Sequence, residues 1–256
     1  MNPDYPLAGL HIAVTRPLAQ AQSLCDGIAR LGGTPICYPL LAVTAISDYT
    51  QFKQQLQKLS STDWAIFISS NAVEFAMPLL KQHYPELPSQ LQFAAIGPQT
   101  ADALKAYGIK QVLIPEQRYD SETLLSLPQM QQMNNQRVAI FRGVGGRELM
   151  AETLKSRGAE VYFAESYQRV NPQINADMLD QQWQQNKLDA LVVTSSEAMR
   201  YLLKLAENSP WLSHVTLCVN HERIAELPKA LGLKVLVAQA PGDDAMLQCL
   251  SELANS

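Results

Sequence analysis

The sequence repeats itself along most of its length. The segment Asp-Trp-Ala-Ile-Phe-Ile-Ser-Ser-Asn-Ala at 63–72 returns without a gap as Asp-Ala-Leu-Val-Val-Thr-Ser-Ser-Glu-Ala at 189–198, so equivalent positions differ by 126. Further matches in the same order, the last two of them looser, are 14–16 with 140–142, 31–33 with 157–159, 95–108 with 218–232, and 120–124 with 243–247. Single β-α units resemble one another by chance, but ungapped matches at one separation favour internal duplication.

Each copy alternates short β-branched runs with amphipathic stretches of helical length, which is typical of parallel strands joined by helical crossovers. The predicted strands are 12–15, 65–69, 94–96, 112–114, 138–141, 161–164, 191–194, 216–219 and 235–238. Predicted helices fill the gaps, and four of them end at glycines suited to the left-handed conformation of a helix C-terminus: Gly32, Gly108, Gly158 and Gly232. The sequence therefore predicts an α/β protein in which each half supplies one mostly parallel sheet with helices on both faces.

Length and composition agree with two globular domains. A chain of 256 residues is long for one compact domain and comfortable for two. Apolar residues make up 47% and charged residues 17%, and the apolar runs are too short to cross a membrane. The start of the chain shows no basic patch followed by an apolar stretch, so we expect a cytoplasmic protein.

Two further classes are disfavoured. The four cysteines and four histidines lie outside any C-x-x-C or H-x-x-x-H spacing, so we expect neither a metal site nor a disulfide framework. A formal net charge of −4 argues against a general nucleic-acid coat, which needs excess positive charge to displace condensed counterions.

Several predicted strands end in residues suited to anion binding. In open parallel sheets, ligands bind beyond the carboxyl ends of the strands, where helix N-termini offer N–H groups and a partial positive charge. Residues of this kind are Arg16, Ser69, Ser70, Thr100, Arg142, Gly143, Arg147, Ser195 and Ser196. Equivalent turns of a duplicated protein are expected to face one another across a cleft between domains, so we predict one site for an anionic ligand.

These turns also have plainer interpretations. A Ser-Ser pair at a helix start often serves only as a cap, and a glycine-rich turn is often only tight. The run 142–147 also resembles a dinucleotide fingerprint, with Glu165 as the acid for a ribose. The third glycine of that fingerprint would be Glu148, whose side chain opposes close backbone packing, so nicotinamide binding is disfavoured.

A set of motifs follows in order along nearly the whole chain. Its parts are Val-Thr-Arg-Pro at 14–17, the segment 63–73, Ala-Ile-Gly-Pro-Gln-Thr-Ala at 95–101, Ser-Glu-Thr-Leu-Leu at 121–125, Arg142-Gly143 with Gly146-Arg147, Tyr-Gln-Arg at 167–169, and 189–196. In order and spacing this set resembles the uroporphyrinogen-III synthase family. The resemblance implies a hydro-lyase that cyclises the linear tetrapyrrole hydroxymethylbilane to uroporphyrinogen III in haem, sirohaem and cobalamin biosynthesis. That reaction inverts the last pyrrole ring, loses water and uses no metal or organic cofactor.

The resemblance also implies roles for single residues. The family's favoured acid is a tyrosine in the interdomain linker, and the matching segment 165–169 places it at Tyr167. The alternative interpretation of Tyr167 is an aromatic packed against the linker. Because the substrate is a polycarboxylate, we expect the arginines, hydroxyls and helix starts named above to bind its carboxylates. His221 and Arg223, whose turn departs from its counterpart, are weaker candidates.

The domain layout implied by the family is interleaved. It gives two similar flavodoxin-like parallel-sheet domains joined by a two-stranded linker. The first comprises 1–37 with 172–256, the second 44–165, and the linkers are 38–43 and 166–171. Two short crossings form a hinge, so we expect opening and closure around the substrate.

The expected partner is the small molecule hydroxymethylbilane, with transient hand-over from hydroxymethylbilane synthase, and neither nucleic acid nor a membrane. We expect a monomer. The main alternative is a two-lobed small-molecule binding or sensor protein that uses the same duplicated architecture without catalysis, since a fold does not fix function.

Overall fold

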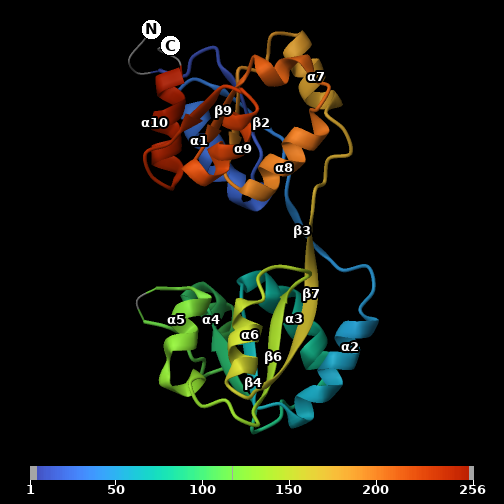
Figure 1. Cartoon of the computed structure of the whole chain (residues 1–256). Coiled ribbons are helices and arrows are strands. Elements are labelled where there is room, and N and C mark those ends of the chain that lie inside the picture. Colours follow the sequence, from blue (N-terminus) through green and yellow to red (C-terminus); the bar gives the residue numbers. More distant parts are fainter. Residues whose placement is uncertain (1–4, 117, 254–256) are drawn as a thin grey trace. The chain divides into compact units, whose positions relative to one another are not determined.

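The structure, a computed structural model, describes residues 5–116 and 118–253. The chain divides into two compact units (Figure 1). We call Val43–Arg169 the central unit and the two flanking segments, Met1–Ala42 and Val170–Ser256, together the terminal unit. The chain therefore passes from one unit to the other twice.

The central unit is built on a five-stranded sheet with the order β3-β7-β6-β4-β5, in which β7, β6, β4 and β5 pair in parallel. Its strands are β3 (Ala42–Ala45), β4 (Trp64–Phe67), β5 (Gln92–Ala95), β6 (Arg137–Gly143) and β7 (Glu160–Val170). Its helices are α2 (Thr50–Gln57), η1 (Lys58–Ser61), α3 (Ser70–His83), α4 (Pro98–Ala106), α5 (Ser121–Ser126), η2 (Pro128–Met130) and α6 (Leu149–Ser156).

Helices cover both faces of this sheet, so its inner strands are apolar on both sides. Along β4, Ala65 and Phe67 join the core formed with α2, α3 and α4, while Trp64 and Ile66 join the core formed with α5 and α6. Phe67 and Phe141, paired on neighbouring strands, stack with ring centroids 4.3 Å apart. Continuous apolar runs therefore form strands here, as the sequence predicted.

The terminal unit has a second five-stranded sheet with the order β10-β9-β8-β1-β2, in which all the neighbouring strands pair in parallel. Its strands are β1 (His11–Val14), β2 (Thr34–Cys37), β8 (Ala190–Val193), β9 (Thr216–Val219) and β10 (Val235–Val237). Its helices are α1 (Leu18–Arg30), α7 (Asp177–Gln184), α8 (Ser196–Leu205), η3 (Pro210–Ser213), α9 (Glu222–Ala230) and α10 (Asp243–Leu253). The cores again lie on both faces, α1 and α10 on one and α7, α8 and α9 on the other.

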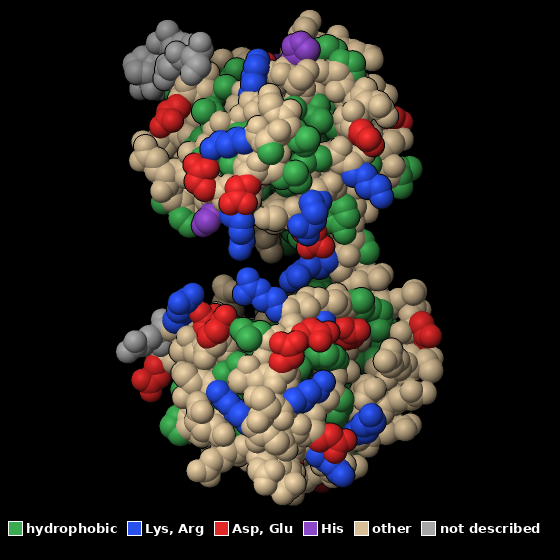
Figure 2. All heavy atoms as spheres, viewed as in Figure 1, with side chains coloured by type: hydrophobic (Ala, Val, Ile, Leu, Met, Phe, Trp, Pro, Cys, Tyr) green, Lys and Arg blue, Asp and Glu red, His purple; other side chains and the backbone are tan. Residues whose placement is uncertain are grey.

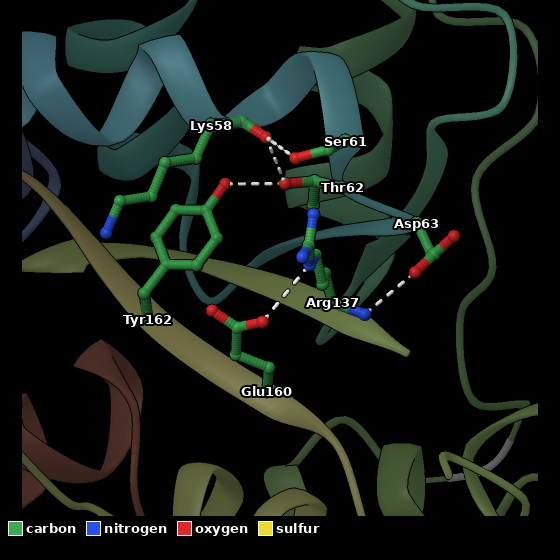
Figure 3. A network of polar contacts seen from close by, with 7 residues as sticks. All are labelled: Lys58, Ser61, Thr62, Asp63, Arg137, Glu160 and Tyr162. Carbon is green, nitrogen blue, oxygen red and sulfur yellow. Dashed lines mark hydrogen bonds and ion pairs between the residues drawn. The ribbon is translucent and has the colours of Figure 1, made fainter. Parts of the chain in front are cut away.

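The duplication extends to single hydrogen bonds. The carboxylate of Asp63 accepts from the N–H of Arg137 at 2.7 Å (Figure 3). The carboxylate of Asp189 accepts from the N–H of His11 at the same distance. The two donors are 126 positions apart, and so are the two acceptors. The two sheets therefore fix the start of an inner strand in the same way.

The amino ends of the central strands also carry a half-buried tyrosine, Tyr162 (Figure 3). The Thr62 hydroxyl donates to the carbonyl of Lys58 at 2.9 Å, so in its 2.7 Å contact with Tyr162 it accepts the phenolic proton. Burial raises the pKa of Tyr162 to about 12. The phenolic proton of Tyr162 is therefore engaged by Thr62.

The predicted helix stops are confirmed, and the strand predictions need corrections. Gly32 and Gly158, equivalent in the repeat, end their helices with φ of +87° and +89°. The predicted strand 112–114 is wrong, because this segment at the edge of the sheet makes a single bridge, from Leu113 to Ala94. Strands β2 and β3 were missed; β2 contains Pro35, which weakens a strand signal but is tolerated at the edge of a sheet, where β2 lies.

Candidate active site

A pocket of about 200 Å³ lies at the carboxyl ends of the central strands. It is walled by the end of β6 and the loop after it, by β7 and by the start of α5 and α6. Three arginines line it, Arg142, Arg147 and Arg169, with Tyr167 beside them. In Figure 2, Lys and Arg side chains gather at the end of the central unit from which β7 leaves. The pocket therefore suits an anionic ligand.

An irregularity in β7 directs Tyr167 across the sheet. Glu165 lies opposite Arg142, but the next pair is Gly143 with Tyr167, so Ser166 is an extra residue in the strand. The carbonyl of Ser166 accepts from the Tyr49 hydroxyl at 3.0 Å, which holds the bulge. Such bulges re-aim a side chain, and here Tyr167 turns over β6.

Glycine at position 143 makes room for this side chain. A Cβ at Gly143 would lie 2.6 Å from Cε2 of Tyr167, closer than any real contact. The ring of Tyr167 also lies 5.9 Å from the ring of Phe75, centroid to centroid. Tyr167 is 2% exposed, and its hydroxyl lies 3.1 Å from the hydroxyl of Ser69 at the end of β4. The structure thus brings Tyr167, Gly143 and Ser69 together.

Arg142 is a buried cation with defined supports. It is 3% exposed, and its guanidinium lies over the ring of Phe163 at 4.2 Å. Its Nε donates to the carbonyl of Gly143 at 3.1 Å and lies 3.4 Å from the carboxylate of Glu165. Glu165 also accepts from the N–H of Gly145 at 3.1 Å, which ties the glycine loop to β7. These hydrogen-bond, ion-pair and ring contacts offset the loss of water around the buried guanidinium.

Other predicted residues of the central unit lie less favourably. Ser70 begins α3 and is half-buried, but it is not part of the pocket wall. Thr100 lies inside α4, and it is not part of the pocket wall either. The structure therefore does not bring Ser70 or Thr100 to the pocket.

In the terminal unit, the predicted residues are partly engaged by the protein. Arg16, after β1, forms an ion pair with Asp243 at the start of α10. Burial alone would raise the pKa of Asp243, but hydrogen bonds from Arg16 and Ser23 and the charge of Arg16 outweigh it, and the net effect lowers that pKa. Any ligand of Arg16 must therefore compete with a carboxylate of the protein itself.

The remaining candidates of this unit lie at helix starts. Ser195 caps α8 by accepting from the N–H of Ala198 at 3.0 Å, and Ser196 is the first residue of that helix. His221 accepts from the N–H of Arg223 at 3.1 Å and so caps α9. The imidazole is thus committed to a structural role in this unit.

Among residues 5–116 and 118–253, no group of three or more His, Cys, Asp and Glu side chains is arranged to hold a metal ion. Within the same described segments, no helix is long and apolar enough to span a membrane.

The comparison with known proteins decides the family. A family model described as "Uroporphyrinogen-III synthase HemD" matches residues 22–248. The uroporphyrinogen-III synthase of Escherichia coli is 36% identical over 94% of this chain and 100% of its own length. That of Salmonella typhimurium is 34% identical over the same shares of the two chains. The chain belongs to the uroporphyrinogen-III synthase family.

Membership in this family confirms the function expected from the sequence, that of a hydro-lyase of porphyrin biosynthesis, over the binding-protein alternative. The predicted fold class is confirmed as well. A crystal structure of uroporphyrinogen-III synthase from Thermus thermophilus, 17% identical, covers 96% of this chain and 99% of its own with a TM-score of 0.62. One from Helicobacter pylori, 16% identical, covers 95% and 99% with a TM-score of 0.55.

Sequence reasoning missed some residues of the pocket. Arg169 is two positions after Tyr167 on the same strand, so strand periodicity would have placed both on one side of β7. Ser121 follows Asp120, whose carboxylate caps α5 through the N–H of Thr123 at 2.8 Å. The Asp-Ser sequence at a helix start was the available signal for Ser121.

Proposed function

We propose that this synthase holds the hydroxymethyl end of hydroxymethylbilane in the pocket of the central unit, since a pocket of about 200 Å³ is too small for the whole molecule, and uses Tyr167 as the general acid of its cyclisation. The observation that carries the proposal is the presence of a phenol and three arginines in one pocket. Positive charge suits the acetate and propionate side chains of the substrate, and a phenol carries its proton at neutral pH.

The arginines have distinct capacities for binding carboxylates. Arg142 is held by Phe163 and Glu165, so its guanidinium is oriented before a ligand arrives. A preorganised guanidinium binds a carboxylate with little further loss of side-chain entropy. Arg147 and Arg169 add charge at the same pocket. We assign Arg16, Ser70, Thr100, Ser195 and Ser196 to carboxylate binding with less structural support.

The proposed chemistry balances without a cofactor. Tyr167 donates its proton to the leaving hydroxyl of the substrate, the C–O bond breaks, and water departs from an azafulvene-like electrophile. The far end of the chain attacks that electrophile through a spiro species, and rearrangement inverts the last ring. The proton released when the inverted ring regains its aromaticity restores the phenol. General acid help of this kind is worth about 10²- to 10⁴-fold.

Positioning the substrate is the second part of the proposal. The ends of a flexible linear tetrapyrrole must meet, and holding reacting groups together accelerates such steps strongly. We further propose that the protein acts as a monomer in the cytoplasm and receives hydroxymethylbilane directly from hydroxymethylbilane synthase.

One assay tests the proposed reaction. Hydroxymethylbilane is supplied at neutral pH, the products are oxidised, and isomer III is resolved from the isomer I that forms spontaneously. We expect isomer III with the wild-type protein, and isomer I alone would contradict the reaction. Tyr167→Phe should slow turnover markedly. Tyr162→Phe, which removes a half-buried phenol from the same strand, should leave the rate of isomer III formation unchanged, because Tyr162 lies in a network at the amino ends of the strands (Figure 3).

A further inference from the structure

The hydrogen bonds of Ser69 decide how the Tyr167 proton is oriented. Ser69 precedes α3, and its Oγ accepts from the N–H of Ala72 at 3.1 Å. A serine hydroxyl has two lone pairs and one proton. With one lone pair taken by Ala72, Ser69 meets the Tyr167 oxygen, 3.1 Å away, either with its proton or with its second lone pair. In the free protein, either hydroxyl can donate to the other, and the proton of the one that accepts is left for another acceptor.

A substrate in the pocket breaks this symmetry. When the phenol donates to the leaving hydroxyl, its proton no longer points at Ser69. The Ser69 proton then has the phenolic oxygen as its acceptor, and the N–H of Ala72 keeps the serine oxygen in place. Each hydroxyl then donates one hydrogen bond in a single direction, from Ser69 through Tyr167 to the substrate.

The packing around Tyr167 keeps the two oxygens together. The ring lies close to the backbone of Gly143 and stacks with the ring of Phe75, so it has little freedom to turn away. Ser69 itself is fixed as the cap of α3, a helix of 14 residues with a partial positive charge at its N-terminus. Both the donated proton and this charge stabilise the negative charge that develops on the phenolic oxygen as it gives up its proton.

We propose that Ser69 is a positioning residue for the Tyr167 phenol: its hydroxyl donates to the phenolic oxygen, so that the phenolic proton points into the pocket at the leaving hydroxyl. This inference rests on the proposed role of Tyr167 as the acid. It replaces the carboxylate-binding role that the sequence predicted for Ser69. Ser69 itself touches no reacting atom and acts only through Tyr167.

A double-mutant cycle tests this role. Ser69→Ala should lower kcat by about 5-fold, the value of one neutral hydrogen bond, to about 100-fold, the value of a donor to a developing anion, with KM changed less than about twofold. Ser69→Thr, which keeps a hydroxyl and a helix cap, should restore kcat to within about threefold. In the Tyr167→Phe background, Ser69→Ala should change kcat less than about twofold, because the phenolic oxygen is gone.

Two controls separate this role from a structural one. Ser195→Ala removes the equivalent cap, that of α8, and should lower the melting temperature as much as Ser69→Ala does. Replacing the nine tyrosines with 3-fluorotyrosine gives a resonance for Tyr167, identified by its loss in Tyr167→Phe. Ser69→Ala should shift that fluorine resonance without any substrate present, and Ser69→Thr should leave it close to its wild-type position.

Three results would overturn the inference. Equal losses of kcat from Ser69→Ala with and without the Tyr167 hydroxyl would show that Ser69 acts independently of the phenol. A rise in KM with unchanged kcat would return Ser69 to carboxylate binding. An unshifted fluorine resonance would exclude the hydrogen bond. Failure of the proposed function would be seen in a separate assay, in which the wild-type protein would yield isomer I alone. The fluorine resonance does not depend on the outcome of that assay, because it is recorded without substrate.

Discussion

The ring of Tyr167 occupies the space that a side chain on Gly143 would need, with 2.6 Å between Tyr167 Cε2 and the position of a Cβ at residue 143. Gly143→Ala must therefore displace the ring and lengthen its contact with Ser69. Overpacking of this kind costs about 1–3 kcal/mol. We expect urea denaturation to show this loss in the free energy of unfolding. We also expect kcat to fall about tenfold or more, because the rate drops steeply when a catalytic group is misplaced.

Gly33→Ala provides the control for crowding alone. A Cβ at Gly33 would lie 2.9 Å from Ile28 Cγ2 and 3.1 Å from Leu7 Cβ, all in the terminal unit. The equivalent position in the repeat is Ala159, so this site accepts a methyl group in one half of the protein. We expect a comparable loss of stability with kcat within about twofold of wild type. A kcat loss matching that of Gly143→Ala would mean that destabilisation alone explains both.

Arg142→Met should weaken substrate binding more than folding. Hydrogen bonds to charged groups are worth about 1.5–3 kcal/mol, so KM should rise about 10- to 150-fold. The matched control is Lys105→Met, which removes the same charge from a side chain that is 56% exposed and paired with Asp102 on the surface of α4. Steady-state kinetics should show KM for Lys105→Met within about twofold of wild type. Equal rises in the two variants would point to net charge rather than the pocket.

The ion pair between Arg16 and Asp243 predicts a pH dependence of stability. The pKa of Asp243 is lower in the folded protein than its ordinary value, so the pair stabilises the fold above about pH 4 and is lost as the pH falls through the lowered pKa. Asp243→Asn should cost about 1 kcal/mol or less at pH 7, since the pair is partly exposed. Urea midpoints of the two proteins should converge below pH 4. A constant difference down to pH 3 would exclude the pair as its source.

The repeat and its turns were predictable because they depend on local chemistry. The Ser-Ser pairs at 69–70 and 195–196 predicted two helix caps, and Ser69 and Ser195 form them. A glycine just after a predicted helix indicates a left-handed residue, and Gly32 and Gly158 have that conformation. The arginines and glycines of 142–147 were predicted to lie together at the end of a strand, and Arg142, Gly143 and Arg147 line one pocket at the end of β6. These signals require only neighbouring residues and the period of a strand or helix.

The contacts of the site were not predictable, because they join residues distant in the chain. Arg16 and Asp243 are 227 positions apart, so no local pattern shows that the arginine is paired. Tyr167 reaches Ser69 only because Ser166 is an extra residue in β7 and position 143 lacks a side chain. A strict alternation along β7 contains no sign of that bulge. The burial of Thr100 within α4 likewise depends on packing that no local pattern contains.

Asp63 and Asp189 predict equivalent effects in separate units. Each carboxylate accepts from the first N–H of an inner strand at 2.7 Å, Asp63 from β6 and Asp189 from β1. Replacement by Asn keeps the shape but removes the charge, at a cost of about 1 kcal/mol. Hydrogen exchange should then rise in Arg137–Gly143 for Asp63→Asn and in His11–Val14 for Asp189→Asn, because local opening follows the stability of each sheet. Equal increases in both strands for either variant would show that the two units unfold together, and would contradict local control by each aspartate.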